Sequence, residues 1–192
     1  MQTSESLLKR LKVDPEAAQL ADFPFEFDTL VAAFGPLTHV EPVRLASGAP
    51  LDPIAKDHSG GTYFLCGEGD DEDRPVLFAD SEGSAGLIGT NLRDALLLLI
   101  GLPCADEALH WEKEGRIMDE QALQALRDED DAEYIEAAEL EDLPGMRAEL
   151  LDRLGLGPLP PLTELLERAR AAAALDPEYV LVNEQGNTYR QD

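Results

Sequence analysis

The chain has 192 residues, of which 44% are hydrophobic, and its 40 acidic and 15 basic residues give a formal net charge of −25. So large an apolar fraction excludes a disordered acidic polymer, and the length favours a single folded domain. The negative charge repels nucleic acid and anionic membranes, so we expect neither as a partner, whereas a basic protein would be attracted. Acidity of this degree also fits a plain adaptation for solubility.

The first fifty residues predict short elements separated by proline and glycine. In chain order they are a helix over 7–11 capped by Thr3 or Ser4, a helical turn over 16–21, an extended aromatic segment over 23–27, a helix from Asp28 through Phe34, and an edge or irregular strand within 38–46. Residues 47–53 are rich in Gly and Pro and predict a loop.

Residues 51–102 predict structure most plainly. Thr62–Cys66, Pro75–Ala79 and Ala85–Gly89 are short apolar runs joined by polar turns, which favours three antiparallel strands in a meander. Gly60-Gly61 supplies a turn in which at least one φ is expected to be positive. Leu92–Leu102 is apolar at almost every position, so it predicts a core helix opened by Thr90 or Asn91. At about half the roughly 20 residues that span a bilayer, it is too short for a membrane anchor.

Three motifs of this block resemble the core of the SUKH superfamily. They are Ile54-Ala55-Lys56-Asp57-His58-Ser59-Gly60-Gly61, then Pro75-Val76 leading into Asp80-Ser81-Glu82-Gly83, then Asn91-Leu92-Arg93-Asp94. That superfamily consists largely of bacterial immunity proteins, which neutralise a toxin from the same locus by binding it. The resemblance covers roughly the middle third of the chain. It implies a toxin-binding protein without catalytic residues.

The second half of the chain predicts helices. They are expected over 105–111, in one or two pieces within 106–142, over 146–154 and over 163–175, before a terminal hairpin over 179–190. The block Asp128-Glu129-Asp130-Asp131 favours a break or bend, because neighbouring like charges repel. We therefore predict one α+β domain over 1–192, with an antiparallel sheet covered by helices. Its SUKH-like core spans about 28–111 and its acidic helical extension about 112–178.

The sequence contains little that indicates a catalytic or metal-binding site. Asp57-His58-Ser59 has the residue types of a hydrolytic triad, but three consecutive side chains point apart. His110 and Glu114 share a helix face without a second histidine nearby, which favours a solvated surface over a metal site. The acids of the loop between the first two predicted strands lack the spacing of a calcium-binding loop. We expect no cofactor, no metal and no enzymatic activity.

The acidity itself predicts the partner. We interpret the chain as an immunity-type protein that captures a basic toxin, by resemblance a nuclease. The predicted partner-binding residues are Glu68, Asp70, Asp71, Glu72 and Asp73, with Asp128, Glu129, Asp130 and Asp131 as a weaker second cluster. The loop over 67–74 is equally interpretable as a solvated connection that protects a strand edge. The alternative function is an enzyme or regulatory scaffold with a pocket near His58 and Tyr63.

The sequence also predicts the cellular compartment and the state of the two cysteines. The amino-terminal residues lack an apolar stretch of signal-peptide length, which favours the cytoplasm. Cys66 and Cys104 stand in no metal-ligand spacing, so both are expected to be free thiols.

Overall fold

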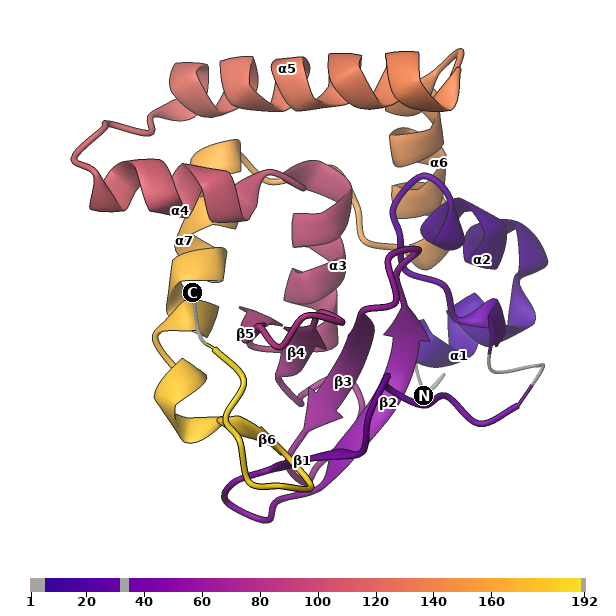
Figure 1. Cartoon of the computed structure of the whole chain (residues 1–192). Helices are drawn as coiled ribbons and strands as arrows, with labels where there is room; N and C mark the ends of the chain where they lie inside the picture. Colours follow the sequence, from indigo (N-terminus) through magenta and orange to yellow (C-terminus); the bar gives the residue numbers. More distant parts are fainter. Residues whose placement is uncertain (1–5, 32–34, 191–192) are drawn as a thin grey trace.

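The computed structural model describes residues 6–31 and 35–190, and these form an α+β fold (Figure 1). The helices are α1 (Leu7–Val13), α2 (Pro15–Asp22), α3 (Leu92–Gly101), α4 (Ala105–Lys113), α5 (Glu120–Ala138), α6 (Leu143–Leu154), α7 (Leu162–Ala173) and the short 3-10 helix η2 (Asp176–Glu178). The strands are β1 (Val43–Leu45), β2 (Leu51–Lys56), β3 (Thr62–Cys66), β4 (Val76–Ala79), β5 (Ala85–Gly89) and β6 (Leu181–Asn183). The predicted fold class, an antiparallel sheet with helices packed on it, is confirmed.

The central sheet has four strands in the order β2-β3-β4-β5, all antiparallel. The predicted three-strand meander is confirmed as β3, β4 and β5. The prediction of a loop up to Pro53 is wrong, because β2 begins at Leu51 and pairs with β3. Pro53 is tolerated because β2 is an edge strand, where a residue without an N–H breaks no ladder, and the register shifts between Pro53 and Ala55.

The two faces of this sheet lie in two different cores. Tyr63 and Leu65 of β3 belong to the larger core, which contains apolar residues of every long helix from α1 to α7. Phe64 and Cys66, which point to the opposite face, belong to a smaller core that includes Leu181 of β6 and the carboxyl-terminal end of α7. Because neighbouring residues of a strand face opposite sides, β3 is buried along its whole length.

The short sheet of β1 and β6 covers that second face. Val43–Leu45 pairs antiparallel with Leu181–Asn183, so the predicted irregular strand within 38–46 finds its partner at the far end of the chain. Beyond β6 the chain turns back: Val182 bridges Thr188, and the N–H of Tyr189 donates to the Leu181 carbonyl at 2.9 Å. Figure 1 shows these two strands below the central sheet.

Helix α3 lies at the centre of the larger core, as the apolar run Leu92–Leu102 predicts. Asn91 is its cap, since the Asn91 side-chain oxygen accepts the Asp94 N–H at 2.9 Å. Gly89 lets β5 approach closely, because a Cβ there would lie 2.5 Å from the Ala95 backbone nitrogen. The helix therefore packs directly against the end of its preceding strand.

The amino-terminal region differs in detail from the prediction. The cap of α1 is Ser6, whose hydroxyl accepts the Lys9 N–H, whereas Thr3 and Ser4 lie outside the described residues. The Asp28 carboxylate accepts the N–H groups of Leu30 and Val31 at 2.6 and 3.1 Å, as expected of a helix cap. Residues 32–34 of that predicted helix lie outside the described part of the chain.

The prediction of a break or bend at Asp128–Asp131 is wrong, because α5 runs uninterrupted from Glu120 to Ala138. Like charges on one helix cost only a few tenths of a kcal/mol per pair. Tertiary contacts offset that cost: both Asp131 carboxylate oxygens accept from Arg147 of α6, at 2.7 and 3.0 Å. Among the described residues, no helix has the length and apolar character needed to cross a membrane.

Candidate functional site

The β3–β4 loop carries the first predicted acidic cluster, and its acids are exposed. Arg74 closes the base of the loop: its buried guanidinium donates to the Leu65 carbonyl at 2.9 Å and pairs with Asp52 at 2.7 Å. Glu72 accepts the N–H of Leu7, at the amino terminus of α1, where a carboxylate is favoured. The loop is thus held at its base and at one acid.

The remaining loop acids have no such contact. Within the described residues, no side-chain hydrogen bond or ion pair involves Glu68, Asp70, Asp71 or Asp73. Their charge is therefore presented to solvent from a fixed platform. The predicted interpretation of the loop as a partner site stays a prediction, as does its interpretation as a solvated connection.

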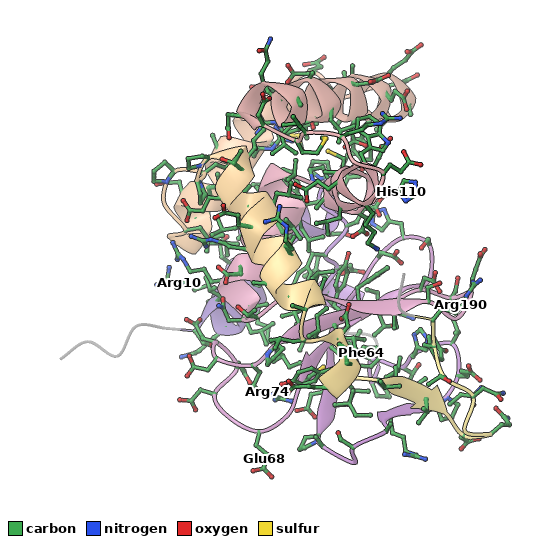
Figure 2. The ribbon with its side chains drawn as sticks, turned by 90° about the vertical axis from the view of Figure 1, so that its left-hand side faces the viewer. Arg10, Phe64, Glu68, Arg74, His110 and Arg190 are labelled. Atoms are coloured by element: carbon green, nitrogen blue, oxygen red, sulfur yellow. The ribbon has the colours of Figure 1, made fainter. Side chains whose placement is uncertain are left out.

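The second predicted cluster is divided by the turn of α5. Asp128 and Glu129 are exposed, whereas Asp130 and Asp131 are partly buried and line a cavity. Successive residues of a helix point about 100° apart, so four consecutive acids cannot share one face. Glu68 and α5 lie at opposite ends of the molecule (Figure 2). The two clusters therefore form separate surfaces.

The cavity has a volume of about 350 Å³, within the range of small-molecule sites. It lies between residues 24–26, the larger-core face of the central sheet, and helices α3, α5 and α6. Its apolar wall includes Phe78, Ile88 and Leu99, and the rings of Tyr63 and Phe78 are 4.8 Å apart. Segments that are far apart in the sequence, from Pro24 to Arg147, thus meet around one hollow.

Five carboxylates and one guanidinium also line this cavity. They are Glu26, Asp57, Asp106, Asp130, Asp131 and Arg147. Burial, and after it the charge of Asp57, raises the pKa of Glu26. Burial, and after it Asp131, likewise raises the pKa of Asp130. In both cases burial disfavours the charged carboxylate, and a neighbouring carboxylate adds to the effect.

The Asp57-His58-Ser59 segment forms a turn rather than a hydrolytic array. Asp57 accepts the N–H groups of Ser59 and Gly61 at 3.0 and 2.5 Å and the Ser59 hydroxyl at 2.6 Å. The His58 ring instead contacts the Asp22 carboxylate at 2.8 Å, and this hydrogen bond raises the His58 pKa. Of the predicted alternative pocket, Tyr63 lines the cavity, and His58 is not among its lining residues.

A polar relay that sequence reasoning missed surrounds His39. Its ring nitrogens lie 3.0 Å from the Thr62 hydroxyl and 3.1 Å from the Tyr189 hydroxyl, which in turn donates to Glu41 at 2.9 Å. Burial lowers the pKa of His39, and burial and Glu41 raise that of Tyr189 to about 12. The relay ties the 39–41 segment to β3 and the carboxyl-terminal segment. No local pattern signals contacts across 150 residues.

No metal site is formed by the described residues: nowhere in 6–31 or 35–190 do three or more His, Cys, Asp or Glu side chains come together as ligands. The His110 ring of α4 lies 3.5 Å from the carboxylate of Glu114, the residue that caps the carboxyl end of this helix, and both side chains are exposed. Cys66 and Cys104 are free and buried, and burial raises both thiol pKa values to about 12.

Comparisons with models of known protein families, with curated proteins and with solved structures found no match to this chain. The SUKH resemblance is thus carried by its three motifs alone. In the structure these motifs occupy the β2–β3 turn, the β4–β5 turn and the start of α3. Asp57 organises the first turn, and Asp80 the second, where its carboxylate accepts three backbone N–H groups at 2.8 Å.

Proposed function

We propose that this chain is a non-enzymatic binding protein of the immunity type, which captures a basic toxin in the cytoplasm through its acidic β3–β4 loop. The observation that carries the proposal is the loop geometry. Four exposed acids without partners in the described structure stand on a base that Arg74 holds to Leu65 and Asp52. A charged tip on a rigid base steers an oppositely charged partner at little cost in ordering.

The net charge of −25 supports the same proposal, because long-range attraction raises the encounter rate with a cationic protein. The resemblance to SUKH proteins supports a nuclease toxin as the partner class. The outward acids of α5, Asp128 and Glu129, are the second surface. Because they lie at the other end of the molecule, one small toxin domain would not engage both at once.

A salt series on the association rate tests the proposal. The partner is recovered by co-purification from the native host, and its association is followed by stopped flow with the parent chain and a loop variant. In the variant Glu68, Asp70, Asp71 and Asp73 become Gln or Asn, while Glu72 is kept because it contacts α1. We expect slower association for the variant and a flatter salt dependence, since exposed charges are screened beyond about 8 Å at physiological salt.

A matched control removes the same number of charges elsewhere. Four glutamates are exposed, and no side-chain hydrogen bond or ion pair involves them in the described structure: Glu136, Glu167, Glu178 and Glu184. Their replacement by Gln removes the same four negative charges, so the comparison separates the effect of the loop from that of the overall net charge. Equal association rates for the two variants, or rates indifferent to salt, would contradict the proposal.

The second candidate function is an enzyme or regulatory scaffold that uses the cavity beside Tyr63. The observation that favours it is the group of titratable side chains converging on one hollow, which is typical of ligand-binding sites. A metabolite screen by thermal shift, followed by an assay of each stabilising compound for turnover or for an effect on partner binding, distinguishes the two functions. Only the second function expects a stabilising small molecule that is also turned over or regulates a partner.

A further inference from the structure

The cavity between residues 24–26, the central sheet and α5 combines excess carboxylate with aromatic walls. We propose that it binds a small organic ammonium ion, in which a protonated amine carries an apolar group. This inference is independent of capture by the β3–β4 loop, which lies at the other end of the molecule from α5.

The carboxylates of the cavity differ in how well they are satisfied. Asp131 is paired with Arg147, and Asp57 accepts the N–H and O–H groups of its own turn. Glu26 and Asp130 are partly buried, and no cation or hydrogen-bond donor of the described residues contacts either side chain. A partly buried carboxylate without a partner is costly, and a bound cation would remove that cost.

Tyr63 provides a second, independent indication of a ligand. Its side chain is only 4% exposed, yet its hydroxyl has no hydrogen-bond partner among the described residues. Tyr63 lines the cavity, as do Asp57 and Glu26, the two carboxylates whose charge acts on it. The buried side-chain atoms without a partner in the described structure are Thr29 Oγ1, Arg74 Nε and Arg127 Nε, so the unpaired Tyr63 hydroxyl remains accessible although the residue as a whole is buried. It is therefore free to hydrogen-bond a polar ligand group in the cavity.

The apolar walls define the rest of the ligand. Phe78, Ile88 and Leu99 offer hydrophobic surface, and Tyr134 of α5 adds a second phenol ring. Aromatic faces attract ammonium groups, and apolar walls bind the hydrocarbon they carry. An anion would meet five carboxylates against the single, already paired Arg147. An amine that carries an apolar group can pair with the carboxylates and pack against the apolar side chains.

Titration calorimetry on the full chain tests the inference, with phenethylamine as the probe and phenethyl alcohol as its neutral isostere. We expect the amine to bind and the alcohol to bind at least about tenfold more weakly, because hydrogen bonds to charged groups contribute about 1.5–3 kcal/mol. Glu26→Gln and Asp130→Asn should each weaken amine binding about tenfold. Tyr63→Phe, which keeps the ring, should weaken it about threefold.

Glu136→Gln is the matched control, since it makes the same chemical change as Glu26→Gln on an exposed part of α5. It should leave amine affinity unchanged. A lysine residue blocked at both ends distinguishes the source of the ammonium: variant-sensitive binding of this probe indicates a protein side chain, and its failure beside phenethylamine binding indicates a small metabolite. Equal affinity for amine and alcohol, no binding of either amine, or loss with Glu136→Gln equal to that with Glu26→Gln would overturn the inference.

Discussion

The ion pair between Arg147 and Asp131 should be a main stabilising contact of the helical half. Arg147 is only 6% exposed, and its Nε donates to the Ile100 carbonyl at 2.6 Å while both terminal nitrogens reach Asp131. One side chain of α6 thereby joins α5 to the last turn of α3, where helix carbonyls need partners. Asp131→Asn removes the countercharge and leaves a buried guanidinium beside a neutral amide.

Breaking one partner of a buried pair typically costs 3–5 kcal/mol, because the remaining charge stays desolvated. The Asp131 side chain is 14% exposed, so water partly screens its charge. We therefore expect Asp131→Asn to lower the free energy of unfolding by the lower value of that range, about 3 kcal/mol. Arg147→Met should cost at least as much free energy, since it also removes the hydrogen bond that the Ile100 carbonyl accepts. The double variant Arg147→Met with Asp131→Leu replaces charge by packing, so its loss should be well below the sum of the single losses.

Urea unfolding followed by circular dichroism measures these differences from the midpoint and slope. Glu112→Gln is the control, because it breaks a solvent-exposed pair with Arg170 and should cost below about 1 kcal/mol. A loss for Asp131→Asn no larger than for this control would refute the reasoning, as would strict additivity in the double variant.

Three further predictions concern single side chains. Gly61→Val should destabilise by about 1–3 kcal/mol in urea unfolding, because a Cβ there would lie 2.5 Å from the Phe78 ring; an unchanged midpoint would contradict this. Asp130→Asn should stabilise the folded chain slightly at neutral pH, because burial and, after it, the charge of Asp131 disfavour the ionised carboxylate. That gain should shrink as the pH falls through the raised pKa of Asp130, where the folded state takes up the proton; melting curves across pH check the sign. Cys66, with a thiol pKa of about 12, should react with a disulfide reagent about 100-fold more slowly in the folded than in the unfolded chain.

Local chemistry explains what was predictable. The strands over 62–66, 75–79 and 85–89 are separated by polar connections rich in Gly, Ser and Asp, residues that favour chain reversal, so their antiparallel order follows from chain connectivity. Gly60 has φ +97°, in agreement with the expected positive value in the first turn. The core helix over 92–102 was equally visible, because an apolar run of that length has to be covered.

Only the tertiary structure decided the continuity of α5 and the pairing of β1 with β6. Charge repulsion within Asp128–Asp131 is a local effect, and it is outweighed by Arg147, a residue 16 positions away from its partner Asp131. Strand β1 is short and contains no self-sufficient pattern, so its pairing depends on a strand about 140 residues later.

The sequence by itself determined the charge, the α+β class and the exposed acids of the β3–β4 loop, because each depends on residue type and on neighbours in the chain. The cavity was decided only by folding. Glu26, Tyr63 and Asp130 are separated by dozens of residues, and their side chains meet because α5 and the 24–26 segment both pack beside the central sheet. Which acids of Asp128–Asp131 face that hollow is set by the rotation of α5 about its axis, and that rotation is fixed by contacts of α5 with α3, α6 and α7.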